Sequence, residues 1–261
     1  MSKGYAVITG ASAGLGVCFA NRLAKEGYPL VLVARRRERL EALAESLEKK
    51  YCVICKVIVS DISKEKDCKA LIKELKELPI EILINNAGFG ECGAFFETNI
   101  KNDLNMIDVN IKALHMLMKF ALLKMKKKDK GYILNVASSA GLIPAGPFMS
   151  TYYATKSYVA SLTQAVSEEL RQAKSHIYVG CLCPGPVDTE FNEVANVKFA
   201  LKGISAKYCA NYAIDQMFAR KKVIVPELRM KIAVTFGRYL PLWLYVRIVA
   251  KQQKKKIGNK V

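Results

Sequence analysis

Short apolar runs alternate with amphipathic stretches along the whole chain. The apolar runs have the length of strands and fall near residues 4–9, 30–34, 53–59, 81–85, 131–137, 177–182 and 223–225. Between them, apolar residues recur at three- and four-residue steps, which predicts helices near 14–26, 37–49, 64–77, 99–127, 151–173 and 206–219. This alternation is typical of α/β proteins. It predicts a doubly wound parallel sheet of about seven strands with helices on both faces.

The first apolar run leads directly into a glycine-rich turn, Thr9–Gly16, and a helical pattern follows that ends at Gly27. Glycines in such a turn let backbone N–H groups approach a pyrophosphate, and the start of a helix favours its negative charge. The spacing is Gly-x-x-x-Gly-x-Gly and not the usual Gly-x-Gly-x-x-Gly. Because a strand precedes the turn and a helix follows it, we interpret it as the phosphate site of a dinucleotide.

The second apolar run ends at Ala34 and is followed by Arg35, Arg36 and Arg37. In dinucleotide folds an acidic residue here binds the ribose 2′-hydroxyl of NAD, whereas arginine accommodates the 2′-phosphate of NADP. Arg35 lies nineteen residues after Gly16, close to the expected spacing of about 20. An ordinary solvated helix start is the alternative, but arginines there oppose the helix dipole. The pattern therefore favours NADP(H).

Tyr152 and Lys156 are four residues apart, and Ser139 lies thirteen residues before Tyr152. On a helix the side chains of Tyr152 and Lys156 would share a face. An ammonium beside a phenol favours the phenolate and lowers its pKa toward neutral pH. A serine hydroxyl aimed at the same substrate oxygen would hold it and stabilise its developing charge. Tyr-x-x-x-Lys alone is weak, because a packed tyrosine beside a solvated lysine gives the same pattern.

Together these motifs resemble the short-chain dehydrogenase/reductase family over residues 4–226. The matching segments are Thr9–Gly16, Asp61, Asn85–Gly88, Asn110, the set Ser139, Tyr152 and Lys156, and Pro184–Thr189. The resemblance implies a Rossmann-like fold and an oxidoreductase that transfers a hydride between NADP(H) and a carbonyl or secondary alcohol. Many members that use NADP have a basic residue where this chain has Ala13, so Arg35, Arg36 and Ser12 would have to bind the 2′-phosphate.

The resemblance also implies a role for each catalytic residue. Ser139 and Tyr152 would hydrogen-bond the carbonyl oxygen, and Tyr152 would donate the proton. Lys156 would lower the pKa of Tyr152 and hold the nicotinamide ribose, while Asn110 would anchor a water molecule. The family interval selects Ser139 over Ser138, and Lys156 selects Tyr152 over Tyr153. The implied cofactor-binding residues are Gly10, Ser12, Gly14, Leu15, Gly16, Arg35, Arg36, Asp61, Asn86, Ala87, Gly88, Tyr152, Lys156, Pro184, Gly185, Val187 and Thr189.

The sequence does not specify the substrate. We expect residues 89–98 and 189–205 to form the pocket walls, and their apolar side chains favour an apolar ketone or aldehyde. These side chains are Phe89, Phe95, Phe96, Phe191, Val194 and Phe199. The alternative function is a non-catalytic NADP(H)-binding sensor or a membrane-surface scaffold. A complete set of four catalytic residues argues against that alternative.

The eight cysteines do not form a metal-binding pattern. Cys52 and Cys55 lie three apart in a strand-like run, so they would point to opposite faces, and no second pair has zinc-ligand spacing. We therefore expect no metal. Because no signal peptide is recognised, reduced thiols indicate a cytoplasmic protein.

Positive charge is concentrated near the C-terminus. Residues 198–261 contain 15 Lys/Arg and two acidic residues, a net charge of +13 out of +18 for the chain. We divide the chain into a dinucleotide-binding and catalytic domain, 1–226, and a basic, amphipathic extension of the same domain, 227–261.

Read as a helix, the extension has an apolar stripe with basic residues opposite. The stripe consists of Leu242, Tyr245, Val246 and Val249, and the basic residues are Arg247, Lys251 and Lys254. This pattern is typical of peripheral contact with an anionic membrane, and equally of packing on the domain itself or on a second subunit. Arg238, Pro241 and Arg247 interrupt any membrane-spanning stretch. We expect a homo-oligomer, dimer or tetramer, and no nucleic acid partner.

Overall fold

The computed structural model describes residues 3–191, 203–237 and 239–257. Its main sheet has seven parallel strands in the order β3-β2-β1-β4-β5-β6-β9. The strands are β1 (Tyr5–Thr9), β2 (Leu30–Ala34), β3 (Cys55–Val59), β4 (Ile80–Asn85), β5 (Gly131–Val136), β6 (Ile177–Leu182) and β9 (Val223–Ile224). The strand order reverses between β1 and β4, where open α/β sheets bind ligands. The predicted doubly wound sheet is confirmed.

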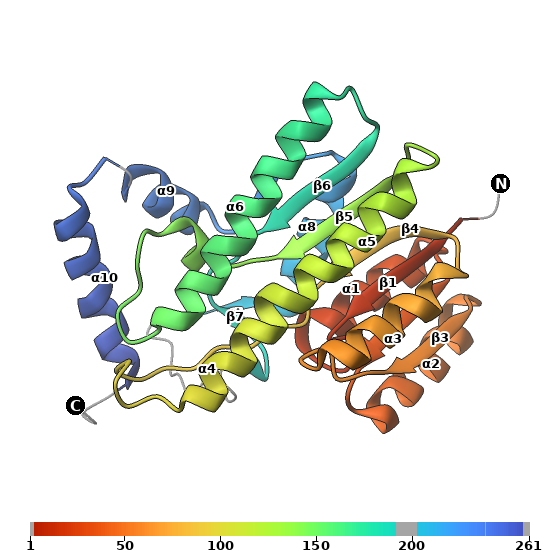
Figure 1. Cartoon of the computed structure of the whole chain (residues 1–261), viewed down its shortest axis with the longest axis horizontal. Helices are drawn as coiled ribbons and strands as arrows, with labels where there is room; N and C mark the ends of the chain where they lie inside the picture. Colours follow the sequence, from red (N-terminus) through yellow and green to blue (C-terminus); the bar gives the residue numbers. More distant parts are fainter. Residues whose placement is uncertain (1–2, 192–202, 238, 258–261) are drawn as a thin grey trace.

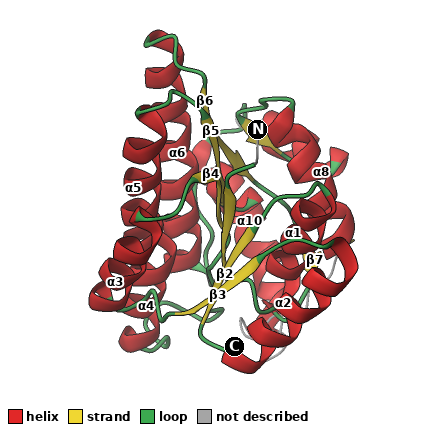
Figure 2. Ribbon diagram, turned by 90° about the vertical axis from the view of Figure 1, so that its right-hand side faces the viewer, coloured by secondary structure: helices red, strands yellow, loops and turns green. Residues whose placement is uncertain are grey.

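Helices cover both faces of the sheet (Figure 2). On one face are α1 (Gly14–Lys25), α2 (Arg37–Tyr51) and α8 (Ala206–Phe218), and on the other are α3 (Glu65–Lys76), α5 (Leu114–Lys126) and α6 (Ser150–Gln172). Alternate residues of each strand enter the two cores, as the period of two requires. Ile8 and Leu32 pack in the first layer, and Val7 and Val31 in the second.

The single helix predicted over 99–127 is interrupted in the structure. It consists of α4 (Ile100–Ile107), a π-helical turn η1 (Asp108–Ala113) and α5. Single π turns are frequent at functional sites because they re-aim one side chain without ending the helix. Here the turn contains Asn110, whose side chain is 1% exposed.

Two short elements connect the sheet to the loops at its carboxyl edge. A 3-10 turn, η2 (Ser139–Leu142), follows β5, and a small parallel pair joins β7 (Val187–Asp188) to β8 (Ile204–Ser205). η2 follows β5 and contains the predicted Ser139, and β7 follows β6 within the Pro-Gly segment. Both elements therefore lie at the edge of the sheet where the predicted site segments meet.

The extension forms two helices, α9 (Leu228–Gly237) and α10 (Leu242–Ile257), beyond the carboxyl ends of β5 and β6 (Figure 1). The predicted stripe is divided between core and solvent: Tyr245 and Val249 are buried, whereas Leu242 is 63% exposed. The buried pair packs against Met149 and Tyr153. The interpretation of the whole stripe as a membrane-facing surface is therefore wrong, because Tyr245 and Val249 pack on the domain itself. Among the described helices, none is both long and apolar enough to cross a bilayer.

Candidate active site

A cavity of about 790 Å³ lies at the carboxyl edge of the sheet. Loops that follow β1, β2, β4, β5 and β6 form its walls, together with residues from α6, α9 and α10. The predicted residues that line it are Gly10, Ser12, Gly14, Leu15, Arg35, Arg36, Asp61, Asn86, Ala87, Gly88, Ser139, Tyr152, Lys156, Pro184, Gly185, Val187 and Thr189. Gly16 and Asn110 lie behind this lining and act through their neighbours.

The glycine-rich turn leaves β1 with a backbone that only glycine adopts readily. Gly10 and Gly14 have φ values of +66° and +54°. A side chain at Gly16 would overlap the Gly10 carbonyl oxygen. Asn86, after β4, fastens the turn because its Nδ2 donates to the Thr9 carbonyl oxygen at 2.9 Å and to the Gly10 carbonyl oxygen at 3.2 Å. The result is a fixed turn at the start of α1 in which the three glycine positions carry no side chain.

The adenosine end of the cavity is basic. Arg36 Nε donates to the Ser12 hydroxyl at 3.2 Å, so two of the three groups predicted for the 2′-phosphate are already together. Arg35 also lines the cavity. Asp61 lies nearby, and its carboxylate accepts from the backbone N–H of Ser63 at 3.3 Å and from its hydroxyl at 2.8 Å.

Glu190 also lies at this end and was not among the predicted site residues. Its carboxylate accepts from Arg36 Nη1 at 2.9 Å and from Arg39 Nη1 at 2.6 Å. These hydrogen bonds lower the pKa of Glu190, and the one from Arg36 has the larger effect. The Glu190 carboxyl group is therefore ionised at neutral pH. A phosphate bound by Arg36 would have to share or displace this carboxylate.

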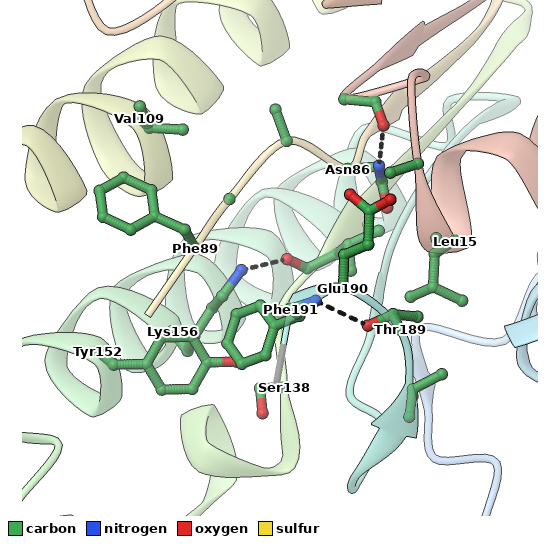
Figure 3. Close-up of a pocket in the computed structure, with 18 of the residues that line it drawn as sticks. Leu15, Asn86, Phe89, Val109, Ser138, Tyr152, Lys156, Thr189, Glu190 and Phe191 are labelled. Carbon is green, nitrogen blue, oxygen red and sulfur yellow. Dashed lines mark hydrogen bonds between the residues drawn. The ribbon is translucent and has the colours of Figure 1, made fainter. Parts of the chain in front are cut away.

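Tyr152 and Ser138 lie close together at the other end of the cavity (Figure 3). The hydroxyl of Tyr152 forms a hydrogen bond with Ser138, which also accepts from the Ala140 N–H at 3.2 Å. Both serines line the cavity, so Ser139 stays the residue that the family interval predicts, and the contact with Tyr152 makes Ser138 a second candidate. Ser138 also caps η2.

Tyr152 and Tyr153 point to different surroundings. Whereas Tyr152 reaches Ser138, the Tyr153 hydroxyl accepts a hydrogen bond from Gln253 Nε2 of α10. The two rings are 6.3 Å apart between centroids and nearly perpendicular. This geometry supports the choice of Tyr152 as the proton donor.

Lys156 is buried beside Tyr152, with Nζ 5.8 Å from the centroid of its ring. Nζ donates to the Val136 carbonyl oxygen at 2.8 Å (Figure 3). Burial lowers the pKa of Lys156 to about 8. Burial also raises the pKa of Tyr152 to about 12, against the opposite effect of its hydrogen bond with Ser138. The expected lowering of the Tyr152 pKa by Lys156 is not seen here, because Nζ is directed at the backbone carbonyl.

The side chain of Asn110 is fully engaged by the protein. Its Nδ2 donates to the Phe89 carbonyl oxygen at 2.9 Å and to the Thr155 hydroxyl at 3.1 Å, and its Oδ1 accepts from the Phe89 N–H at 3.1 Å. Asn110 therefore ties the loop after β4 to α6. Gly88 allows the approach, since a Cβ there would lie 2.9 Å from Asn110 Oδ1 and 3.2 Å from Lys156 Nζ.

The Pro-Gly segment after β6 connects the cavity to the extension. The Gly185 N–H donates to a Glu227 carboxylate oxygen at 2.9 Å. Burial raises the pKa of this Glu227 carboxyl group. Thr189 packs near the glycine turn, where a Cβ on Gly14 would lie 3.2 Å from it.

The apolar wall differs in part from the expected one. Phe89 and Phe191 line the cavity, whereas Phe95 and Phe96 are exposed, Phe96 at 87%. Val194 and Phe199 lie outside the described residues. The sequence did not predict the wall residues Met149, Met230, Gln252 and Gln253.

Known proteins agree with this geometry. The family described as short chain dehydrogenase matches residues 4–198, three quarters of the chain. This chain belongs to the short-chain dehydrogenase family. A relative in Gallus gallus, named hydroxysteroid dehydrogenase-like protein 1, is 34% identical over 92% of this chain and 73% of its own length.

Two further members show how widely the family varies. The very-long-chain 3-oxoacyl-CoA reductase of Meyerozyma guilliermondii is 37% identical over 64% of this chain. The aligned region is 52% of that relative, so this short-chain dehydrogenase spans about half its length. A solved short-chain dehydrogenase from Sphingobium yanoikuyae in complex with NADPH superposes with a TM-score of 0.83, at 31% identity, over 90% of this chain and 93% of the other.

Proposed function

We propose that this short-chain dehydrogenase reduces an apolar ketone or aldehyde with NADPH, and oxidises the corresponding secondary or primary alcohol in the reverse direction. The observation that carries the proposal is the convergence of Tyr152, Ser138 and Lys156 at one end of a cavity whose other end holds the glycine turn and Arg36. A proton donor and a dinucleotide cradle in one cavity are the two parts that carbonyl reduction requires.

The residues present fit a nicotinamide dinucleotide. A side chain at Gly10, Gly14 or Gly16 would crowd the turn, and Asn86 holds it in place. When bound, NADPH would supply the hydride. Gly10, Gly14, Leu15 and Gly16 would hold its pyrophosphate, Asp61 and Ala87 its adenosine, and Val187 and Thr189 its nicotinamide end.

Side chains of the protein would donate the proton and stabilise the charges that its transfer creates. Because the pKa of Tyr152 is raised, the phenol is protonated at neutral pH and can donate to a carbonyl oxygen. Ser138 holds the phenol and would hydrogen-bond the same substrate oxygen, which stabilises the charge that develops there. Lys156 in its ammonium form would hold a ribose hydroxyl and favour the phenolate after transfer. Asn110 acts as a positioning residue, since it fixes the backbone of Phe89 and the α6 residue Thr155.

NADP(H) is preferred over NAD(H) in this proposal. Arg36 and Ser12 already form one donor cluster at the adenosine end, and Arg35 adds a second guanidinium. The solved Sphingobium yanoikuyae relative contains NADPH. Comparison of the dissociation constants of NADPH and NADH tests the preference, and equal values would contradict it.

A panel of aldehydes, cyclic and acyclic ketones, ketosteroids and 3-oxoacyl thioesters tests the reaction itself. NADPH consumption is followed at 340 nm. We expect turnover of at least one apolar carbonyl compound, its loss in Tyr152→Phe, and its retention within a few-fold in the neighbouring variant Tyr153→Phe. A binding-only sensor, the alternative function, would bind NADPH and turn over no member of the panel.

Peripheral contact with an anionic membrane is a second proposal, and we assign it to a face other than the predicted stripe. Three α9 side chains spaced by four residues, Leu228, Ile232 and Phe236, are exposed, as are Leu242 and Trp243 at the start of α10. No acidic residue occurs after Glu227 in the sequence, while basic residues lie on both helices. Apolar side chains ringed by cations are suited to an anionic lipid surface.

Co-sedimentation of the full chain with phosphatidylserine-containing vesicles tests this face. Binding should weaken as salt rises and should fall in Phe236→Ser with Trp243→Ser. Phe96→Ser, which changes an exposed aromatic residue outside these two helices, is the control. Unchanged binding in the double variant, or no binding at low salt, would contradict the proposal.

The remaining expectations concern assembly and compartment. We propose a homo-oligomer in which exposed apolar residues of α4 and α5, such as Leu104, Ile107 and Leu123, meet a second copy. Light scattering of the purified protein at several concentrations tests it. A cytoplasmic location also stays a proposal; it is consistent with eight cysteines that form no disulfide.

A further inference from the structure

The C-terminal helix α10 forms part of the substrate end of the cavity. Its buried residues Tyr245 and Val249 pack in one cluster with Met149, Tyr152 and Tyr153. One turn further on, Gln253 lines the cavity and is 3% exposed. The extension thus contributes a buried polar side chain next to the catalytic helix α6.

Only one end of the Gln253 amide has a partner. Nε2 donates to the Tyr153 hydroxyl, which fixes the orientation of the side chain. Within the described chain, Oε1 is buried and accepts no hydrogen bond. A buried amide oxygen without a donor costs about 1–3 kcal/mol, so such atoms are rare in folded proteins. An unpaired acceptor in the wall of a cavity is suited to a ligand that carries a donor.

The surroundings of Gln253 make this acceptor selective. Tyr153, which contacts Gln253, packs in one cluster with Met149, Phe89 and Phe191, and all four line the cavity. An apolar skeleton would fill such a space but would leave Oε1 unpaired. A skeleton with one donor at the right position would satisfy it.

We propose that Gln253 is a specificity-determining residue whose Oε1 accepts a hydrogen bond from the substrate, so that the enzyme selects apolar carbonyl compounds that carry a second, hydrogen-bond-donating group. The donor is a hydroxyl or an amide N–H, which have the same chemistry toward Oε1. The inference rests on the proposed carbonyl reduction. A site built to bind a donor rejects the analogue that lacks it far more strongly than a site that is only apolar.

Paired substrates test the proposal and separate the two donors. One pair is a polycyclic hydroxyketone and its methyl ether; the other is a 3-oxoacyl N-acetylcysteamine thioester and the analogue whose amide is replaced by an ester. For at least one pair, kcat/KM of the wild type should be ten-fold or more higher for the compound with the donor. The arm that shows the preference identifies the donor.

The variant Gln253→Met keeps the length of the side chain and removes the acceptor. It should reduce the preference to less than two-fold, mainly through the compound with the donor, while the dissociation constant of NADPH stays within two-fold. Lys251→Met, an exposed change on the same helix to the same residue, is the control and should retain the preference. A preference absent from both pairs, or unchanged in Gln253→Met, would overturn the proposal.

Failure of the proposed reduction can be told apart from failure of this inference. If no compound is turned over, calorimetric titration of the same pairs into the full-length protein with NADPH measures the preference as binding. A ten-fold tighter binding of the donor compound that is lost in Gln253→Met supports the inference without turnover. Equal binding of both members of each pair overturns it.

Discussion

Ser138 and Ser139 are adjacent, and only one of them is expected to take part in catalysis. Ser138 forms a hydrogen bond with the Tyr152 hydroxyl and accepts from the Ala140 N–H. Ser139 donates its backbone N–H to the Pro184 carbonyl oxygen at 2.8 Å, a contact that alanine would keep. Ser138→Ala and Ser139→Ala therefore form a matched pair.

The magnitudes follow from these contacts. Loss of one preorganised donor to a developing oxyanion lowers kcat by about 10²–10³-fold, or about 2.7–4 kcal/mol. Ser138→Ala should reach this range, whereas Ser139→Ala should stay within about five-fold of the wild type. Since Ser138 also caps η2, its loss should lower the free energy of unfolding by about 0.5–2 kcal/mol.

The assay measures kcat and KM with saturating NADPH on the best carbonyl substrate of the panel, together with the urea midpoint of each variant. Ser138→Thr keeps a hydroxyl and should recover most of the rate that Ser138→Ala loses. A loss of 100-fold in Ser139→Ala, with Ser138→Ala near wild type, would refute the assignment. It would also restore the choice made from the family interval.

Further outcomes are expected at Lys156, at Gly88 and at the pair Arg36 and Glu190. Because burial lowers the pKa of Lys156 to about 8, its ammonium is present below that pH and lost above it, so kcat/KM for reduction should fall as pH rises through about 8. The guanidinium of Lys156→Arg stays charged. Initial-rate assays from about pH 6 to 10 should therefore show the fall in kcat/KM of this variant at least one pH unit higher than in the wild type. Gly88→Ala should lower kcat ten-fold or more, measured with NADPH and the best carbonyl substrate, since its Cβ would press on Asn110 and Lys156. Arg36→Ala should reduce the NADPH preference about ten-fold, equal to about 1.4 kcal/mol, and Glu190→Gln should tighten NADPH a few-fold, both by fluorescence titration.

Local patterns were sufficient for the sheet and for the dinucleotide end of the site. A period of two in the strands and three to four in the helices is a property of neighbouring residues. The carboxyl ends of parallel strands share one edge, so the segments that follow β1, β2 and β4 had to meet there. This is why Gly10 and Arg36, predicted from local patterns, and Asn86, predicted from the family resemblance, line one cavity.

Residues that depend on an irregular backbone were harder to predict. The family interval selected Ser139, whereas the backbone that enters η2 brings Ser138 to the Tyr152 hydroxyl. The π turn around Asn110 likewise has no signature in the helical period. In both cases the local backbone geometry decides which groups the side chain contacts.

Partners that are distant in the sequence gave no signal at all. Glu190 meets Arg36 across 154 residues, and Gln253 meets Tyr153 across 100. Each contact depends on the folded sheet bringing its loops and the extension together. The apolar stripe of α10 was recognised, but the period alone could not tell whether Val249 faces lipid or protein.

The adjacent tyrosines on α6 show why the extension matters for function. Tyr152 is held by Ser138 for proton transfer, and Tyr153 holds Gln253 in the substrate wall. Glu227 ties the start of the extension to Gly185 in the Pro-Gly segment. Residues 227–261 are therefore coupled to the catalytic helix at one end and to the cofactor loop at the other. Removal of the extension would take away a cavity wall as well as any membrane face, so variants of single exposed side chains in the full chain are needed to separate membrane contact from substrate binding.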